Sequence, residues 1–553
     1  MFRKTQDYQI SFDDRLVFAD AQTKTAVDSS RAKLVGDIIY PNVDEDKFSA
    51  LFSEKGSRPN ISIKQYVSAL VLKRMYRMSD EVLIEFLRGG SLNFQYALHT
   101  TQDEKQPLSE SSLRRFRRRI EAYNEENGCD LIKDEFERIS RKMAVDMGVL
   151  HIDQNTGEDD EKVILVRMDS METRCHAKAM SRLEILYTTN VIVLRYLLKK
   201  GFKDIIPDSL SHYFEDGDRN RVTYHRSKEA KNTDTPDTRI DETIAEMLLI
   251  QTTMEETFAQ ALLSKIPEYE VFRRVLEEQT KKDENGNTVA KDNGEISPDS
   301  VQNPFDWAAT YRFKRGQHHG YVMNVAEAID GKGNGIITHA SVEANTCADS
   351  SMAEQYMEEQ PDNGPKQVFT ADGAYNSEHL EELAAQKNID IQTTSLTGAE
   401  PYDIDADFVL NEEGTEILSC PCGKVPVENK YSEKTGYITA TMPENCCRDC
   451  PHKDDCNVHS NKKNTVSKVK LTKKMVKRAE QARSFTTEEG RANARRRNGV
   501  EGIMSVMRRK YDIDHLPVFG IDRVKNWIWT TLLSYNLVKY QKYQNASQKE
   551  LTA

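Results

Sequence analysis

Two aspartates of this 553-residue chain stand in the same kind of sequence context. Asp169 closes the aliphatic stretch VILVRMDS, residues 163–170, and Asp372 follows the similar stretch KQVFTA. Both stretches have the composition of short buried strands, and carboxylates at the ends of adjacent strands of an α/β sheet point into one crevice. Such carboxylates repel each other unless a cation lies between them, and oxygen ligands suit Mg²⁺ or Mn²⁺. The pattern predicts a divalent-metal site, although strands also end in aspartate for turn formation alone.

A third carboxylate lies within a strongly basic segment, where a helix that only bound anions would not need an acid. The stretch RRRNGVEGIMSVMRRKY, residues 495–511, contains Glu501 as its only acid among six arginines and lysines. Residues 461–511 have 16 Lys and Arg against 4 Asp and Glu, although the net charge of the chain is −12. A local excess of positive charge is typical of nucleic-acid contact, because the distribution of charge matters more than its sum.

These motifs resemble those of DDE-type transposases of bacterial insertion sequences, in the group with a Tyr-x2-Arg-x3-Glu-x6-Lys signature. The arginine and the glutamate match at Arg497 and Glu501, whereas Ala494 stands at the tyrosine position and Arg508 at the lysine position. The second aspartate of that group lies in Asp-Gly/Ala-x-Tyr/Phe, which the stretch DGAY matches. The strand pair RFKRGQHHGYVMNVAEAID and the closing helix GIDRVKNWIWTTLLSYNLVKY are also similar.

The resemblance covers roughly residues 60–540 and implies an RNase H-like catalytic core. Asp169, Asp372 and Glu501 would hold two Mg²⁺ or Mn²⁺ ions around a scissile phosphate. The protein would be a DNA transposase that binds the inverted-repeat ends of an insertion sequence, hydrolyses the phosphodiester bond there and transfers the 3′ ends to target DNA. Two alternatives stay open: an RNase H-fold nuclease or resolvase without strand transfer, and an inactive relative that only binds DNA.

Several basic and aromatic residues are candidates for contact with DNA. Short capped helices that lead to the arginine-rich LRRFRRRI, residues 113–120, indicate a helix-turn-helix-like module, with a helical bundle as the alternative. Arginines beside the glutamate would clamp phosphate, and Trp527 and Trp529 could stack on an extruded base, although such residues are more often core. The candidate DNA-binding residues are Arg114, Arg115, Arg117, Arg118, Tyr375, Arg497 and Arg508.

Six of the nine cysteines lie between residues 420 and 456, which favours a metal site over disulfides in a reducing compartment. Cys447 and Cys450 form a Cys-x2-Cys pair with a distant partner pair, a spacing that suits tetrahedral Zn²⁺. The resemblance to the related transposase branch implies a structural zinc held by Cys420, Cys447, Cys450 and Cys456. The rival ligands are Cys422, Cys446, His452 and His459, and reduced cysteines without metal are the alternative.

The elements that must position these residues indicate an α/β protein with an RNase H-like mixed sheet, a helical N-terminal domain and an inserted segment. We expect an irregular segment at 1–60, a helical DNA-end-binding domain at 61–150, and a first core part at 160–398 with a helical insertion at about 180–300. A β-rich, cysteine-containing insertion would follow at 399–495, and residues 496–545 would complete the core.

Composition narrows the partners and the location. Hydrophobic residues make up 38% of the chain and charged residues 30%, without an apolar run near the ~20 residues of a membrane span. The N-terminal stretch lacks the apolar centre of a secretory signal, so we expect a cytoplasmic protein. The resemblance implies a bacterial protein that is nucleoid-associated when bound to DNA. No Walker-type loop indicates a nucleotide cofactor. The expected partners are double-stranded DNA, at transposon ends and target, and a second copy in a dimeric DNA complex.

Overall fold

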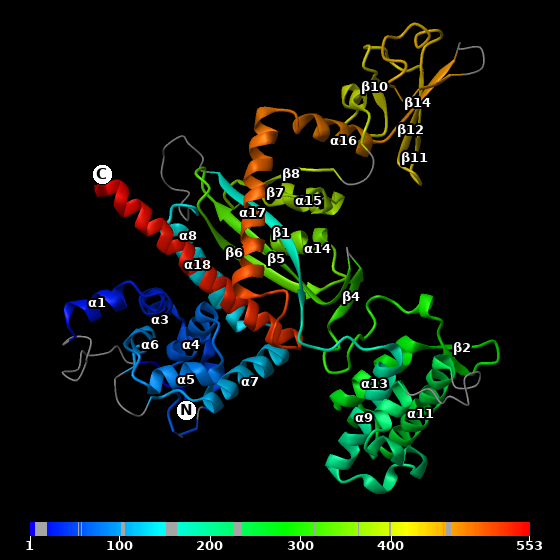
Figure 1. The fold of residues 1–553 in the computed structure, drawn as a ribbon. Coiled ribbons are helices and arrows are strands. Elements are labelled where there is room, and N and C mark those ends of the chain that lie inside the picture. The colour runs from blue at the N-terminus through cyan, green and yellow to red at the C-terminus, as the bar shows by residue number, and fades with distance from the viewer. Residues whose placement is uncertain are drawn as a thin grey trace.

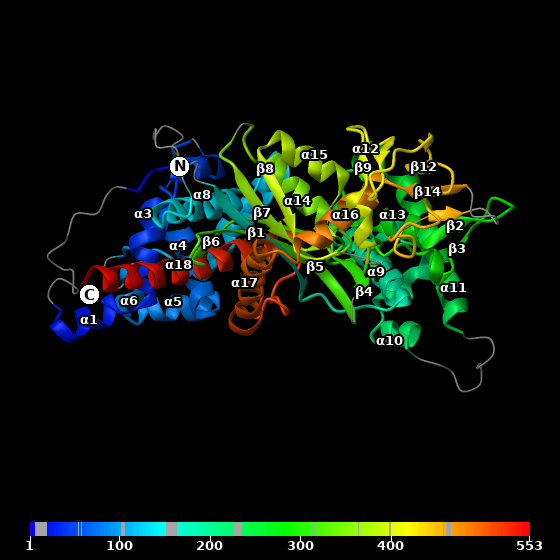
Figure 2. The same ribbon diagram turned by 90° about the horizontal axis from the view of Figure 1, so that it is seen from above.

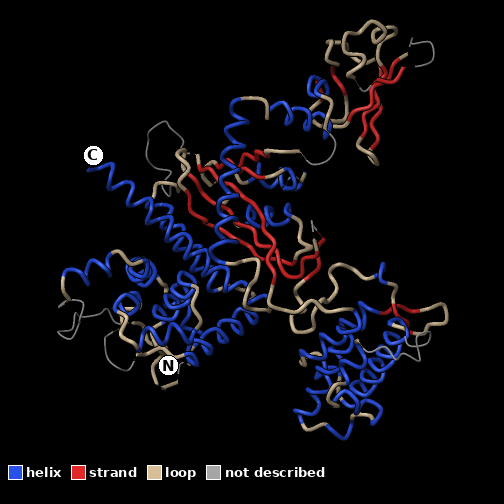
Figure 3. The backbone as a smooth tube through the Cα atoms, viewed as in Figure 1, coloured by secondary structure: helices blue, strands red, loops and turns tan. Residues whose placement is uncertain are grey.

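The computed structural model describes most of the chain. The described residues are 1–5, 19–53, 55–56, 58–100, 106–150, 163–224, 235–313, 316–362, 364–375, 377–396, 400–456, 458–460 and 466–552. They form a mixed α/β protein around one six-stranded sheet, as the sequence predicts (Figure 1, Figure 3). Within these residues, none of the helices combines the length and the apolar character that crossing a membrane requires.

The N-terminal region is helical from Ala21 onward, so the prediction of an irregular segment at 1–60 is wrong for much of its length. The side chains of Asp20 and Ser30 cap the first two helices, and Phe48 is fully buried in the same core as the later helices. These helices are too short to show a hydrophobic period in the sequence. The helices of this region are α1 (Ala21–Asp28), α2 (Arg31–Leu34), a π-helical turn (Val35–Ile39), α3 (Tyr40–Asn42), a 3-10 helix (Glu45–Leu51), α4 (Ile63–Tyr76), α5 (Asp80–Arg88), α6 (Leu92–Ala97), α7 (Glu110–Asn127) and α8 (Leu131–Asp146).

Serine caps start two of these helices where the sequence predicts them. The hydroxyl of Ser79 accepts the backbone N–H of Val82 at the start of α5, and the hydroxyl of Ser109 accepts that of Ser112 at the start of α7. Each cap satisfies a backbone donor that the first helical turn leaves unpaired. The arginine-rich stretch is therefore helical and begins at a defined residue.

The central sheet has the strand order β4-β5-β1-β7-β8, with β6 also paired to β5. β1 pairs antiparallel with β5 and parallel with β7, and β7 pairs parallel with β8, so the sheet is mixed. β5 and β6 form a hairpin around the stretch GKGNG. The strands are β1 (Ile164–Arg174), β4 (Thr310–Phe313), β5 (Gln317–Ile329), β6 (Gly335–Ala344), β7 (Gln367–Ala371) and β8 (Ile389–Thr393).

Helices cover both faces of the sheet. Side chains alternate along β1, so successive residues of this strand face the helices of opposite layers. Val166 and Met168 pack against α14 (Asp349–Glu358) and α15 (Glu378–Gln386). On the other face, α17 (Glu488–Tyr511) crosses β1 and β7, and α18 (Ile521–Thr552) packs against β6 together with α8 (Figure 1). The buried side chain of Asn536 on α18 bonds both the N–H and the carbonyl of Ile337 on β6, which fixes α18 to the sheet.

A helical unit lies between β1 and β4 in the chain and has a hydrophobic core of its own. It confirms the mostly helical content expected after β1, and it lies on the side of the molecule away from the N-terminal helices (Figure 1, Figure 2). A short β-hairpin follows the last of its helices. The elements are α9 (Arg182–Lys200), α10 (Asp218–Thr223), α11 (Pro236–Thr257), α12 (Gln260–Leu263), α13 (Pro267–Gln279), β2 (Thr280–Lys282) and β3 (Thr288–Ala290).

The cysteine-bearing segment after β8 is β-rich, as predicted, but only as far as Leu471. Two helices follow, and the second of them, α17, begins at Glu488, before the predicted start of the last core part at residue 496. The hydroxyl of Thr487 caps α17 by accepting the N–H of Gly490. Glu501 therefore lies in the interior of this helix and not in its first turn. The elements are β9 (Val409–Leu410), β10 (Ile417–Ser419), β11 (Glu428–Ser432), β12 (Tyr437–Thr441), β13 (Val458–Ser460), β14 (Ser467–Leu471) and α16 (Lys473–Ser484).

Candidate active site

Asp169 lies within β1, so the prediction that a strand ends at this residue is wrong. β1 pairs with β7 only as far as Arg167, which faces Thr370. Its pairing with β5 continues through Asp169 to Arg174. Asp169 therefore stands just past the carboxyl end of the parallel pair, where β1 keeps its partner on the β5 side alone.

Asp372 directly follows β7, as predicted. Its Oδ1 accepts the backbone N–H of Ala374 at 3.0 Å and the hydroxyl of Ser395 at 3.3 Å. These bonds hold the carboxylate at the end of the strand next to β1. The parallel register of β1 and β7 places it beside Asp169, on the neighbouring strand.

One arginine of α17 joins all three predicted carboxylates. Nη2 of Arg497 lies 3.1 Å from Oδ2 of Asp169 and 3.7 Å from Oδ2 of Asp372. Nη1 of the same side chain lies 3.9 Å from Oε1 of Glu501. Since one guanidinium is within 4 Å of each acid, the structure brings the three carboxylates around a common cation that the chain itself supplies.

The two strand carboxylates are less exposed than the one on the helix. Side-chain exposure is 19% for Asp169, 39% for Asp372 and 68% for Glu501. Burial raises the pKa of Asp169 above its ordinary value, Arg497 lowers it, and the charges of Asp372 and Asp349 raise it further. The negative charge of this site is thus only partly compensated by Arg497.

A fourth acid, Asp349 at the start of α14, lies next to the site. Its Oδ1 accepts the hydroxyl of Ser170 at 2.7 Å, and the backbone N–H of Ser170 donates to Oδ1 of Asp169 at 2.9 Å. Ser170 therefore orients two carboxylates at once. Asp306, the other acid near a strand end in the sequence, is buried and accepts the hydroxyl of Tyr321.

The donor set of the site suits a hard divalent cation. Asp169, Asp372 and Glu501 offer carboxylate oxygens only, which favour Mg²⁺ or Mn²⁺ over Zn²⁺. The guanidinium of Arg497 already lies against the same oxygens, so the site attracts positive charge. These residues fit the catalytic metal ions that the sequence resemblance implies.

Three aromatic candidates are buried, which corrects the predicted roles. Tyr375 is 1% exposed with its hydroxyl 3.3 Å from Oδ1 of Asn324, so it has no surface for DNA. Burial raises the pKa of Tyr375 well above its ordinary value. Trp527 and Trp529 are 6% and 1% exposed and pack in the core, so stacking on an extruded base is wrong.

The basic helix α7 presents three of its four candidate arginines to solvent. Arg114, Arg115 and Arg118 are exposed. Arg117 is half-buried, and its Nη2 pairs with Oδ2 of Asp80 at 2.5 Å, beside Lys73. The charge of Arg117 therefore already has a partner between α7 and α5, and its contact with DNA stays a prediction.

Arg508 is exposed in the last turn of α17, which ends at Tyr511. Its Nε lies 3.4 Å from Oδ1 of Asp514, outside the carboxylate cluster. This side chain faces solvent, in contrast to Arg497, which is 16% exposed and held by acids. The two arginines of the signature thus have different surroundings.

Four of the six clustered cysteines lie in two close pairs. The sulfurs of Cys422 and Cys450 are 3.4 Å apart, and those of Cys446 and Cys447 are 3.5 Å apart. Zn–S bonds of about 2.3 Å in a tetrahedron separate sulfurs by roughly 3.8 Å, so each pair alone has the spacing of two ligands of one zinc. No three of the six sulfurs, all of which belong to described residues, lie within 4.8 Å of one another. Two of the four sulfurs belong to Cys422 and Cys446, the rivals of the predicted ligands, and the choice of four ligands stays a prediction.

Crowding makes these thiols poor acids in the absence of a metal. A bond to Cys450 raises the pKa of Cys422 to about 11, and burial raises the pKa values of Cys446 and Cys456 to about 12. Zinc binds thiolates and removes this penalty. His452 lies near Asp407, whose pKa it helps Arg483 to lower, and His459 is exposed on β13.

Among the described residues, one group of three His, Cys, Asp or Glu side chains has its ligand atoms within 4.8 Å of one another. It lies between α8, β6 and α14. Nδ1 of His339 is 3.0 Å from Oε1 of Glu137 and 3.1 Å from Oε2 of Glu359. Neither ring nitrogen has a partner in hydrogen-bond geometry, so these contacts are electrostatic. Nζ of Lys133 lies 2.9 Å from Glu359 and 3.5 Å from Glu137 and already supplies positive charge. This group connects the N-terminal helices to the sheet.

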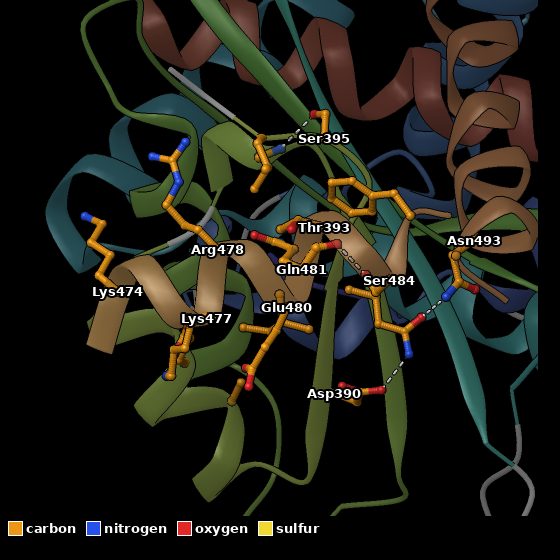
Figure 4. A pocket seen from close by; sticks show the side chains of 18 of the residues that line it. Asp390, Thr393, Ser395, Lys474, Lys477, Arg478, Glu480, Gln481, Ser484 and Asn493 are labelled. Atoms are coloured by element: carbon orange, nitrogen blue, oxygen red, sulfur yellow. Dashed lines mark hydrogen bonds and ion pairs between the residues drawn. The ribbon is translucent and has the colours of Figure 1, made fainter. Parts of the chain in front are cut away.

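A cavity of about 750 Å³ lies between β8 and α16, next to the turn after Asp372 (Figure 4). Its basic side chains come from α16 and include Lys474 and Arg478. As many acids line it, among them Glu381, which pairs with Lys477 at 2.5 Å. The balance of charge gives no indication of an anionic ligand.

Two parts of the chain match known families. Residues 25–119 match the model of a transposase domain (DUF772), and residues 419–541 match the model of a transposase DDE domain. No curated protein and no solved structure matches the chain. The first match covers the N-terminal helices and the arginines of α7, and the second covers the cysteines, Arg497 and Glu501.

Both matched models describe transposases, and DNA is the substrate that this class implies. More narrowly, the two matches together support a DDE-type transposase of insertion sequences.

Proposed function

We propose that this transposase binds the inverted-repeat ends of its insertion sequence, cleaves them by metal-dependent phosphodiester hydrolysis and transfers the 3′ ends to target DNA. The observation that carries the proposal is the convergence of Asp169, Asp372 and Glu501 on the guanidinium of Arg497. A protein that only binds DNA gains nothing from three carboxylates facing phosphate, because like charges repel.

We also propose that the central sheet is an RNase H-like core. In the order β6-β5-β1-β7-β8, only β5 runs opposite to its neighbours, and helices cover both faces. The core would comprise residues 160–398 and 496–545, with the helical unit at about 180–300 and the segment 399–495 as insertions. Residues 61–150 would then bind the DNA ends.

Asp169, Asp372 and Glu501 would hold two Mg²⁺ or Mn²⁺ ions, which when bound lower the pKa of an attacking water and stabilise the leaving 3′ oxygen. The chain prepares these ligands by hydrogen bonds from Ser170 to Asp169 and from Ala374 and Ser395 to Asp372. Fixed ligands reduce the reorganisation that the reaction requires.

Arg497 has a second role in this proposal. Its guanidinium compensates the carboxylates before DNA binds, and it is then available to a phosphate oxygen, which arginine binds with two parallel donors. The freed 3′ hydroxyl would attack target DNA in the same site, without a covalent intermediate on the protein. Arg508, exposed further along α17, would contact the DNA backbone and not the reacting phosphate.

The exposed arginines of α7 would position the DNA end. Arg114, Arg115 and Arg118 lie on one helix that begins at a capped residue, and their contacts would be mainly to phosphates, which fix the register of the protein on the duplex. Pairing of two transposon ends would require a dimer in the DNA complex. The cysteine cluster would hold a structural Zn²⁺ that stabilises a small β-rich segment.

The test is a cleavage and joining assay with Mg²⁺ and a labelled duplex that carries the inverted-repeat end. Cleavage followed by joining, both lost in Asp372→Asn, supports the proposal. The matched control is Asp299→Asn, an exposed acid of the helical insertion that should leave both steps intact. Cleavage without joining would identify a nuclease or resolvase, and binding without either step would identify an inactive relative.

A further inference from the structure

A buried arginine lies two residues before Asp169 on the same face of β1. Arg167 is 5% exposed, and successive odd-numbered side chains of a strand share one face. Its cross-strand partner on β5 is Glu327, which has no exposed surface. Nε of Arg167 donates to Oε2 of Glu327 at 2.6 Å, and Nη2 lies 2.5 Å from the same oxygen.

The pair is anchored from a third element. Nζ of Lys539 on α18 donates to the other carboxylate oxygen of Glu327 at 3.1 Å. Glu327 therefore has a cation on each oxygen, which satisfies a charge that would be costly to bury alone. If Arg167 left this position, the buried carboxylate of Glu327 would lose one of its two cationic partners.

The remaining end of the guanidinium reaches α17. Nη1 of Arg167 donates to the backbone carbonyl of Arg496 at 2.6 Å. This carbonyl lies five residues before Glu501 on the same helix. A side chain fixed in the sheet thus holds the helix that carries the third carboxylate.

Gly499 is the residue that permits this approach. An ideal Cβ at Gly499 would lie 1.8 Å from Nη1 and 2.6 Å from Cζ of Arg167, closer than such atoms can approach. At Gly502, on the other side of Glu501, a Cβ would meet nothing within 4 Å. Glycine in a helix interior costs about 1 kcal/mol relative to alanine, so Gly499 needs a reason that close packing provides.

We propose that Arg167 is a positioning residue of the transposition reaction. Paired with Glu327 and packed against Gly499, it fixes the distance of α17 from β1. At this distance Glu501 faces Asp169 and Asp372. The inference rests on the proposed function of the three carboxylates. Arg167 itself touches no reacting atom. It acts through the backbone of α17, while Arg497 of the same helix contacts the carboxylates with its side chain.

Gly499→Ala and Gly502→Ala form a matched pair that tests the proposal. Both substitutions add one methyl group to α17 beside Glu501, but only the first meets Arg167. We expect Gly502→Ala to keep wild-type cleavage and to melt at the same or a higher temperature. Gly499→Ala should retain binding of the transposon-end duplex, lose about 10²-fold in cleavage rate at fixed Mg²⁺, and need more Mn²⁺ for half-saturation of the DNA-free protein.

Arg167→Met supplies the second measurement. In that background no guanidinium faces residue 499, so adding Gly499→Ala should cost nothing further, a non-additivity that marks direct contact. Additive effects, or equal behaviour of the two alanine variants, would overturn the proposal. The Mn²⁺ titration needs no cleavage, so a wild-type protein that fails to cleave would count against the proposed function and leave the positioning role testable.

Discussion

Replacing Arg497 by glutamine tests whether its guanidinium compensates the carboxylates of the candidate active site. Its Nη2 lies 3.1 Å from Asp169, and the two side chains are 16% and 19% exposed. Two unit charges at this distance attract each other by about 1 kcal/mol in bulk water and by about 5 kcal/mol at an effective dielectric constant of 20. We therefore expect the pair to contribute about 1–5 kcal/mol, with little from the exposed Glu501.

The sign of the effect follows from the pKa of Asp169, which burial raises above 3.8 and which Arg497 lowers. The glutamine variant should raise this pKa further. A carboxyl group whose pKa is raised in the folded protein costs stability as the pH rises through that pKa. In EDTA, the free energy of unfolding of the variant should therefore fall below that of the wild type by about 1–5 kcal/mol at pH 8, and this difference should shrink toward pH 4.

Metal affinity should change in the opposite direction. Mn²⁺ competes with the guanidinium for the same oxygens, so its dissociation constant for the DNA-free variant should decrease at least about tenfold, which corresponds to about 1.4 kcal/mol. Isothermal titration calorimetry measures this constant, and urea unfolding at several pH values measures stability. Arg508→Gln, on the same helix but outside the cluster, should change neither. A stability difference that does not vary with pH, or an unchanged Mn²⁺ affinity, would refute the reasoning.

Three further perturbations test other parts of the molecule. Cys447→Ser should release about one equivalent of zinc, measured by mass spectrometry of the purified protein, and lower the melting temperature, whereas Cys347→Ser should do neither. His339→Gln should destabilise the protein more at pH 6 than at pH 9. Burial lowers the pKa of His339, but the neighbouring carboxylates raise it above 6.5 overall. The contribution of His339 to the free energy of unfolding is therefore lost as the pH rises through this pKa. Chemical unfolding at the two pH values checks this sign. Arg115→Ala should weaken binding of DNA and reduce its salt dependence without changing the melting temperature, whereas Arg117→Ala should lower the melting temperature because it leaves Asp80 without one partner.

Local chemistry made several elements predictable from the sequence. Ser79 and Ser109 precede helices because their hydroxyls cap backbone donors within three residues, and no distant contact is needed for that signal. Asp372 follows its strand for a similar reason, since its carboxylate accepts the N–H of Ala374 in the next turn. Signals of this kind lie within a few residues of the element they define.

Other features depend on partners that are distant in the chain. Asp169 lies inside a strand because the pairing of β1 with β5 continues beyond the point where its pairing with β7 ends. The local sequence does not indicate where each pairing ends. The partner of Arg117 is Asp80, 37 residues away, and the arginine-rich stretch alone does not indicate this pair. Arg167 and Glu327 are 160 residues apart, so their pairing gave no local signal.

The glutamate within the arginine run of α17 is explained by where the neighbouring residues point. The carbonyl of Arg496 faces the sheet and accepts from Arg167, and Gly499 leaves room for that guanidinium. The side chain of Arg497 turns to the two aspartates and to Glu501, so the positive charge of the run compensates its only acid and the strand acids together. A helix that served only to bind phosphate would need the arginines alone. A helix that completes a carboxylate site on a nucleic-acid-binding face needs both charges, because the acids repel the DNA on which they would act unless cations lie between them.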